Sequence, residues 1–390
     1  MASTTFPSRV DDLTSQWLTD VLCASGVSDD VRVSDHSVAP VSDPGQTSEV
    51  VRIALEYEKG SPESQSSLIG KFPTEFEQAR TYAQSAGAYL KEVQFFRIIA
   101  PSAGSLVPRC FAAEIDAESH DFVLILEDLA DLKMGETYDF DSYVGNSSLM
   151  LDRLAPFHAR WWNHPDLETF DWIPRPGTAA YTEYMRMGEE WLSACLPPVK
   201  QAFEKYMSDD AWGVIEKFLR SYGDLTEYAS KHPRFPLTIT HGDFHQKQCF
   251  FPTDRGDRFA VIDWQGVGID VAAKDVVRAL LFEPERRRAH EHAIVGRYHS
   301  ILAKNGVGDY SVEELWEDIR LSSLAAAELY IAGVAQTDND LITAKAAKKG
   351  VDAYEVILTW LGSALDDWGV DQALDRLLAR ARASGGAGTS

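Results

Sequence analysis

Two short stretches of the sequence carry side chains that could hold a metal ion and move a proton. The first stretch reads HGDFHQKQCF from His241, and the second reads FAVIDWQ from Phe259. Asp243 and Gln248 flank a tight connection in the first, whereas Asp263 is a lone carboxylate inside an apolar, strand-like run in the second. Burying a carboxylate without a cation or hydrogen-bond donors is costly, so something must compensate Asp263.

The order of the two stretches predicts a hairpin that brings three oxygen-bearing side chains to one end. Asp263 lies on the strand that returns beside the strand after Gln248, so these two residues and Asp243 can point the same way. Carboxylate and amide oxygens suit Mg²⁺, which binds few protein groups and completes its octahedron with water and substrate phosphates. A magnesium ion is therefore expected to compensate Asp263.

The elements that must position these residues fall into two parts of different character. Apolar spacing predicts a helix over residues 11–24 and another over 76–99, and several runs before residue 127 have strand character. Strands followed by one helix and more strands indicate an antiparallel sheet with a helix packed on it. After about residue 131, long helical segments dominate up to Arg382. The expected strands are 31–41, 49–57, 67–72, 110–115 and 121–126, and later 238–241, 248–251 and 259–263.

The chain length and this order of elements predict a bilobal α+β protein. With 390 residues, the chain exceeds the usual size of one compact core. We expect a sheet-rich domain over residues 1–130, a helical domain over residues 131–383 that carries the two chemical stretches, and a flexible tail of small and polar residues over 384–390.

Composition argues against nucleic-acid and membrane partners. Lys and Arg number 37 against 60 Asp and Glu, a net charge of −23, which repels phosphates and anionic membrane surfaces. No segment offers the run of about 18 apolar residues that a membrane helix needs. Cys23, Cys110, Cys195 and Cys249 form no C-x-x-C pair, so reduced thiols and a cytoplasmic location are expected. The oligomeric state is not predicted.

The motifs, taken in order, resemble those of the protein-kinase-like small-molecule phosphotransferases, the superfamily of aminoglycoside phosphotransferases and choline kinases. HGDFHQKQ followed by VIDWQ resembles the catalytic and metal-binding loops of these enzymes. The ecdysteroid-kinase-like branch is the most similar. Further matching motifs are LIGKFP from Leu68, YLKEVQFF from Tyr89, VPRCF from Val107, LILEDLA from Leu124 and LAPFHARWW from Leu154.

This resemblance implies a protein-kinase-like fold and ATP-dependent phosphorylation of a hydroxyl group on a small molecule. It gives Asp243 the role of the catalytic aspartate, which takes the proton of the acceptor hydroxyl. Asp263 and Gln248 would bind Mg²⁺, Lys71 would pair with the α- and β-phosphates, and Glu92 would hold Lys71.

The resemblance also implies supporting roles around the nucleotide and the catalytic loop. Backbone groups of the hinge would bind adenine, and a phosphate-covering loop would contribute backbone and hydroxyl groups. His241 would support the backbone of the catalytic loop, and Asp275 would brace that loop without touching substrate. The hinge residues are Glu127, Asp128 and Leu129, and the phosphate-loop residues are Gly45, Thr47 and Ser48.

Two features keep other functions open, and the first of them departs from the family pattern. Gln248 stands where the family usually has asparagine, so a catalytically silent, nucleotide-binding module is one alternative. His241, Asp243 and His245 alternate, which on a strand would place three ligands on one face, as in a metal-dependent hydrolase. Within the kinase hypothesis, the acceptor stays open between an antibiotic, a sterol, a sugar and an amino alcohol.

Overall fold

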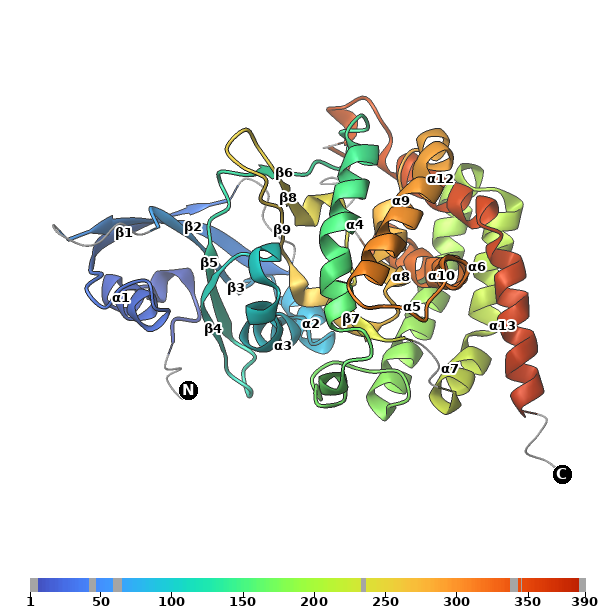
Figure 1. The fold of residues 1–390 in the computed structure, drawn as a ribbon, viewed down its shortest axis with the longest axis horizontal. Helices are drawn as coiled ribbons and strands as arrows, with labels where there is room; N and C mark the ends of the chain where they lie inside the picture. Colours follow the sequence, from blue (N-terminus) through green and yellow to red (C-terminus); the bar gives the residue numbers. More distant parts are fainter. Residues whose placement is uncertain are drawn as a thin grey trace. The chain divides into compact units, whose positions relative to one another are not determined.

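The computed structural model of the chain divides into two compact units. It describes residues 6–41, 47–58, 65–232, 236–336, 343–344 and 346–385 (Figure 1). One unit combines residues 1–134 with 248–267, and the other combines residues 135–247 with 268–390. Each unit thus combines two separate segments of the chain, and the domain bounds of 1–130 and 131–383 stay a prediction.

The first unit is built on an antiparallel sheet of five strands in the order β1-β2-β3-β5-β4. This sheet confirms the predicted one, because each strand begins and ends within two residues of its predicted bounds. Strand β3 is central, with β2 and β5 on either side. The strands are β1 (Val33–Pro40), β2 (Ser48–Tyr57), β3 (Ser67–Pro73), β4 (Cys110–Ile115) and β5 (Phe122–Glu127).

The helical part of the first unit differs from the prediction of one long helix over 76–99. The chain forms α2 (Glu77–Ser85) and α3 (Ala88–Gln94), which are separated at Gly87. Gly87 has a φ of +64°, a conformation that glycine adopts at little cost. The other helical segments are η1 (Val10–Asp12), α1 (Ser15–Ala24), the π-helical η2 (Phe95–Ile99), η3 (Ala100–Ser102) and η4 (Gly104–Leu106).

The first unit also contains the predicted hairpin, as part of a three-stranded antiparallel sheet. Strands β6 (Lys133–Met134), β8 (Cys249–Phe251) and β9 (Ala260–Val261) lie in that order. The returning strand ends two residues before Asp263, so the prediction that Asp263 lies within the strand is wrong. A short turn, η8 (Trp264–Gly266), follows Asp263 directly.

The second unit is mainly helical, as predicted for the residues after about 131 (Figure 1). It contains a two-stranded antiparallel sheet of β7 (Thr238–Thr240) and β10 (Gly268–Asp270), of which β10 was not predicted. The helical segments are α4 (Tyr143–Arg160), η5 (Pro165–Glu168), α5 (Ala179–Phe203), η6 (Glu204–Tyr206), α6 (Asp209–Arg220), α7 (Tyr222–Lys231), η7 (Gln246–Gln248), α8 (Ala273–Leu280), α9 (Pro284–Lys304), α10 (Val312–Gln336), α12 (Ala353–Asp367) and α13 (Val370–Gly385).

The last described helix covers the beginning of the predicted flexible tail. Helix α13 extends to Gly385, and the rest of the predicted flexible tail, residues 386–390, lies outside the described residues. Among the described helices, none combines the length and apolar character that a membrane crossing requires.

A buried arginine holds α9 and α12 together. Arg287 is fully buried and donates to Glu291, 2.6 Å away, and to Asp367. Its guanidinium also lies over the indole ring of Trp368, 5.2 Å from the ring centre. The neighbouring Arg288 contacts the same Asp367 at 2.7 Å but is half exposed.

The substitution Arg287→Met is expected to lower the free energy of unfolding by about 3 kcal/mol, because it leaves the buried carboxylate of Glu291 without its cation. Arg288→Met, the matched control, should cost about 0–1 kcal/mol, as is usual for exposed ion pairs. Urea unfolding of both variants checks the difference. Equal losses in the two variants would show that Arg287 contributes no more than a surface ion pair.

Candidate active site

The first unit contains a buried cluster of one lysine and two carboxylates. Lys71 lies on central strand β3 and Glu92 on α3, and both side chains are almost completely buried. The Nζ atom of Lys71 lies 2.6 Å from Oε2 of Glu92 and 2.7 Å from Oδ1 of Asp263. The structure therefore brings together three of the residues that the sequence singled out.

Charges within this cluster hold Lys71 in its ionised form. Burial lowers the pKa of Lys71, but the nearby carboxylates of Asp263 and Glu92 outweigh burial, and the pKa is raised above its ordinary value. For Glu92, burial raises the pKa and the ammonium group of Lys71 only partly opposes that shift. Removing Lys71 would thus leave carboxylates in a poorly solvated place.

Asp263 is compensated by the protein itself, where the sequence predicted a metal ion. Besides Lys71, two side-chain amides donate hydrogen bonds to Oδ2 of Asp263. Nε2 of Gln248 lies 3.1 Å away and Nε2 of Gln265 lies 3.3 Å away. The prediction overlooked Lys71 as a partner because 192 residues separate the two in sequence. The need for compensation is met without a metal ion, so it is no longer an argument for one.

The backbone of Asp263 is held in a conformation that side-chain-bearing residues rarely adopt. Its φ of +64° and ψ of +57° lie in the left-handed region, which costs on the order of 1–3 kcal/mol for a residue other than glycine. The next residue, Trp264, is fully buried, stacks on Phe95 at 4.0 Å and donates from Nε1 to Val261 O. This packing fixes the turn and aims the carboxylate of Asp263 at Lys71.

The predicted hinge residues use their side chains for ion pairs. The carboxylate of Glu127 is paired with Arg258, whose Nη2 donates to Oε2 of Glu127 at 2.7 Å. Asp128 accepts from Nε of Arg52 and from Oγ of Ser67, both at 2.6 Å. With these carboxylates engaged, the side chains of Glu127 and Asp128 are not free to bind an adenine base.

The remaining hinge residue and the phosphate-loop residues are only partly described. Leu129 is buried, and its carbonyl accepts from Leu132 N at 2.9 Å. Thr47 donates from Oγ1 to Gln265 Oε1 at 2.8 Å. The hydroxyl of Ser48 is buried and has no hydrogen-bond partner within the described ranges. Gly45 lies outside the described residues.

In the second unit, Asp275 anchors the loop that begins at His241. The two oxygens of this fully buried carboxylate accept from His241 N at 2.6 Å and from Gly242 N at 2.9 Å. His158 Nε2 lies 3.3 Å from the same carboxylate. The Nδ1 atom of His241 in turn accepts from Asp243 N at 3.2 Å. These contacts fit the supporting roles that the resemblance implied for His241 and Asp275.

Asp243 itself is paired with an arginine. Nη2 of Arg278 donates to Oδ1 of Asp243, and Nε2 of His245 lies 3.4 Å from Oδ2. Burial raises the pKa of Asp243, but Arg278 and His245 outweigh it and hold the pKa well below its ordinary value. The carboxylate keeps 37% of its side-chain surface exposed, so it is ionised and accessible.

Sequence reasoning missed Arg278, although a signal for it was present. Asp275 and Arg278 are three residues apart on α8, so their side chains lie on one face of that helix. Because Asp275 was expected to contact the loop after His241, the residue three positions later on the same helix face could also be expected to reach that loop. The guanidinium of Arg278 lies 4.4 Å from the ring centre of Tyr330, which adds a cation–π contact.

The geometry does not support the hydrolase alternative. Strand β7 ends at Thr240, and residues 241–245 form a loop in which Gly242 has a φ of +84°. His241, Asp243 and His245 therefore do not share one face of a strand. Asp275 accepts the backbone donors that a continued strand would need. Within the residues that the structure describes, no group of three or more His, Cys, Asp or Glu side chains could hold a metal ion.

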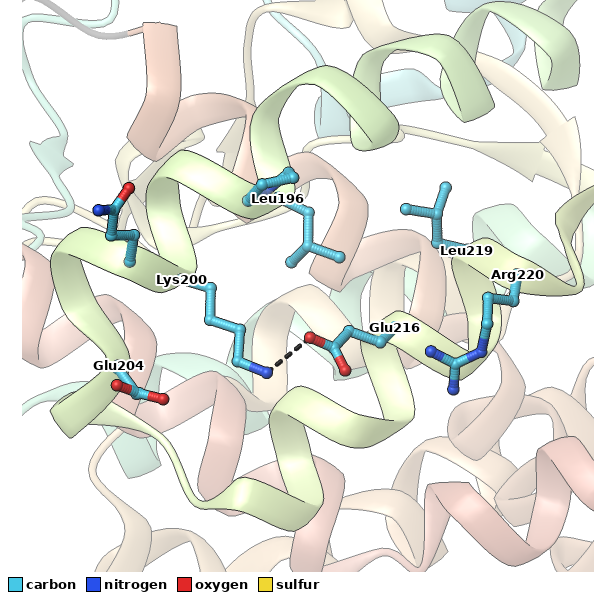
Figure 2. Close-up of a pocket in the computed structure, with 8 residues that line it drawn as sticks. Leu196, Lys200, Glu204, Glu216, Leu219 and Arg220 are labelled. Carbon is cyan, nitrogen blue, oxygen red and sulfur yellow. Dashed lines mark hydrogen bonds and ion pairs between the residues drawn. The ribbon is translucent and has the colours of Figure 1, made fainter.

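A groove and a smaller cavity lie in the second unit. A groove of about 460 Å³ between α5 and α6 is lined by Leu196, Glu204 and Arg220 among others, and it is crossed by an ion pair between Lys200 and Glu216 (Figure 2). None of its lining residues was singled out by the sequence. A smaller cavity of about 140 Å³ is lined by both His245 and Arg278, which contact Asp243.

The comparison with solved structures shows the fold. A protein from Ralstonia eutropha JMP134, provisionally assigned as an aminoglycoside phosphotransferase, matches with a TM-score of 0.51 and 12% identity, over 93% of this chain and 98% of its own. A choline kinase from Cryptosporidium parvum Iowa II matches with a TM-score of 0.49 and 10% identity, over 94% and 97%. The α+β, protein-kinase-like fold predicted from the sequence is confirmed.

Family membership comes from a different comparison. None of the curated proteins compared with this chain matches it. The model of the ecdysteroid kinase-like family, however, matches residues 45–306, which include Lys71, Glu92, Asp243 and Asp263. Since this match covers more than half of the sequence, the chain belongs to the ecdysteroid kinase-like family.

Proposed function

We propose that the protein is an ATP-dependent phosphotransferase that phosphorylates a hydroxyl group of a small molecule. The observation that carries the proposal is the buried cluster of Lys71, Glu92 and Asp263. Three charges in one buried place are weak as a stabilising device. We therefore interpret the cluster as a binding site for the charged phosphates of a nucleoside triphosphate.

The residues of this cluster fit a magnesium ion. Mg²⁺ is usually bound through one or two protein oxygen ligands together with substrate phosphates. Asp263 offers a carboxylate that is 23% exposed, and the amide of Gln248 lies beside it. In the proposed site these two residues hold the ion. Once bound, it would neutralise negative charge on the β- and γ-phosphates.

The proposed chemistry divides between the two units. Lys71, held by Glu92, binds the α- and β-phosphates, and backbone groups of residues 127–129 bind the base. Asp243 orients the acceptor hydroxyl and takes its proton, while the hydroxyl oxygen attacks the γ-phosphorus. The bond between that phosphorus and the oxygen bridging to the β-phosphate breaks, and ADP leaves. The convergence of Asp243 and Asp263 on one nucleotide is part of this proposal.

Two measurements on the unmodified protein test the proposal. Mg-ATP should raise the melting temperature, whereas ATP with EDTA should raise it much less. A panel of sterols, aminoglycosides, macrolides, sugars and amino alcohols should contain an acceptor that accelerates ADP release above the rate with water alone. Stabilisation by Mg-ATP without turnover on any acceptor would favour the silent nucleotide-binding module. No stabilisation at all would contradict both.

The depressed pKa of Asp243 leads to a prediction on the pH dependence of activity. Because the pKa lies well below the ordinary value of about 3.9, Asp243 is already ionised above about pH 4 and contributes no acid limb there. Replacing Arg278 with methionine removes the main cause that lowers this pKa and leaves the burial that raises it. The pKa of Asp243 should therefore rise, and the acid limb of kcat/KM should move to higher pH.

The pH profile is measured between pH 4 and pH 8 on the best acceptor of the panel, with Arg220→Met as the control. Arg220 is an exposed arginine at the groove between α5 and α6, so its replacement should leave the profile unchanged. An acid limb at the same pH in wild type and in Arg278→Met would show that Arg278 does not set the ionisation of the group that limits the rate.

A further inference from the structure

The cavity lined by His245 and Arg278 has both polar and aromatic side chains in its lining. It lies in the second unit, where residues of α4, α8, α10 and α12 line it. Tyr143 and Trp360 form an edge-to-face pair at 5.2 Å in its lining, and Met150 adds an apolar side chain. The lining also includes Arg278 and His245, the two residues that contact Asp243, and the part of the cavity beside them is called its polar end here. Anything bound in this cavity is therefore close to the proposed base.

Arg278 has hydrogen-bond donors to spare at this end. Its side chain is only 8% exposed, and one nitrogen, Nη2, donates to Asp243. The other two nitrogens, Nε and Nη1, are buried and have no hydrogen-bond partner among the described residues. A buried donor without a partner costs on the order of 1–3 kcal/mol, so two on one side chain call for an explanation.

The charges around the cavity restrict what those donors can meet. The described lining includes Arg278 and His245 but no aspartate or glutamate. The carboxylate of Asp243, which both of these lining residues contact, is already paired with Arg278. An ammonium group would enter beside a guanidinium without a carboxylate of its own, which is unfavourable in a poorly solvated place. An oxygen that accepts hydrogen bonds would instead satisfy the free donors.

We propose that this cavity is the acceptor site and that Arg278 determines its specificity. Nε and Nη1 bind a carbonyl or carboxylate oxygen of the acceptor, while Nη2 holds Asp243. This inference rests on the proposed function and names the acceptor class: a hydroxylated molecule that presents a ring-sized apolar part and an oxygen acceptor, with no cationic group at this end. A cavity of about 150 Å³ holds one benzene ring, close to the 140 Å³ available here.

One rigid group would then position both reaction partners. The guanidinium is planar, and its donors point in fixed directions. If two of them hold the acceptor and the third holds the base, the acceptor hydroxyl is kept in register with Asp243. Such alignment is a large part of what an enzyme contributes to phosphoryl transfer. Arg278 is thus a positioning residue as well as the residue that selects the acceptor.

The test uses three acceptors that differ in a single group. They are meta-(hydroxymethyl)benzoate, the corresponding benzamide and the corresponding benzylamine, which share the ring and the hydroxyl group. With wild type, kcat/KM for acceptor-dependent ADP release should be about 10-fold or more higher for the benzoate or the benzamide than for the benzylamine, as expected for a paired donor. A higher value for the benzoate than for the benzamide identifies a carboxylate as the preferred group, and the reverse identifies a neutral carbonyl.

Two variants separate recognition by Arg278 from a merely structural role. Arg278→Lys keeps the charge but loses the forked donors, so the preference for oxygen-bearing acceptors over the benzylamine should fall by about 10-fold, mainly through KM. Arg220→Lys makes the same change at the groove between α5 and α6 and should leave the preference intact. Melting temperatures with Mg-ATP show that each variant is folded.

The outcomes distinguish this inference from the proposed function. Preference of wild type for the benzylamine overturns the inference, even if Arg278→Lys fails to fold. Equal loss on all three acceptors in Arg278→Lys also overturns it, because Arg278 would then act only through Asp243. If Mg-ATP stabilises the protein and some other acceptor is turned over while all three probes are inert, the inference fails but the kinase function stands. Absence of Mg-ATP binding overturns the function itself.

Discussion

Replacing Asp243 with asparagine is expected to lower turnover by about two or more orders of magnitude, the effect of losing a general base. Asparagine keeps the size and much of the hydrogen bonding of the residue but cannot take the proton of the acceptor hydroxyl. Binding of Mg-ATP should change little, because Asp243 is assigned no contact with the nucleotide. Single-turnover kinetics and the thermal shift with Mg-ATP measure the two effects separately.

A matched control for this variant is Asp152→Asn. Asp152 is a partly buried aspartate in the same unit and forms an ion pair with Arg297 at 2.6 Å, so its replacement has a comparable effect on charge. Turnover of this control should stay near that of wild type. If Asp243→Asn also turned over at a near-normal rate, Asp243 would have no part in the mechanism.

Replacing Lys71 with methionine should have the largest effect on stability and should abolish stabilisation by Mg-ATP. Methionine fills a similar volume but leaves Glu92 and Asp263 without their shared cation. Loss of one partner from a buried ion pair costs about 3–5 kcal/mol. Urea unfolding followed by tryptophan fluorescence gives the loss of stability, and calorimetry gives the loss of nucleotide affinity.

Two further variants show whether buried charge is the cause. Adding Glu92→Gln to Lys71→Met removes one of the stranded carboxylates and should restore part of the lost stability. Lys200→Met removes a lysine that also lies 2.6 Å from a glutamate, Glu216, but in a more exposed place (Figure 2), and should cost about 0–1 kcal/mol. Similar losses for Lys71→Met and Lys200→Met would contradict the account of the buried cluster.

The sequence predicted the parts of the site that depend on local structure. Lys71 lies on a strand with clear turn boundaries and Glu92 on a helix with clear apolar spacing, so motif and periodicity agreed on both. The antiparallel sheet followed from the order of strands around one helix. Asp275 was expected to brace the loop after His241, and its carboxylate accepts two backbone donors of that loop.

Other features depend on tertiary contacts that no local pattern reveals. The ion pair between Lys71 and Asp263 spans 192 residues, and without it the sequence offered only a metal ion as the compensating charge. The left-handed turn at Asp263 is fixed by the packing of Trp264 on Phe95, so the strand pattern placed this residue wrongly. The pairing of Arg278 with Asp243, 35 residues earlier, is such a contact, and only the spacing of Arg278 from Asp275 on α8 gave an indirect signal for it.

The central proposal is that Asp263 and Asp243 both serve one bound nucleotide, and a crystal structure with Mg²⁺ and a non-hydrolysable ATP analogue tests it most directly. The account predicts a metal ion bound by Asp263, with Lys71 at the α- and β-phosphates and Asp243 facing the γ-phosphate. A nucleotide bound elsewhere, or a γ-phosphate with Asp243 turned away from it, would contradict the account.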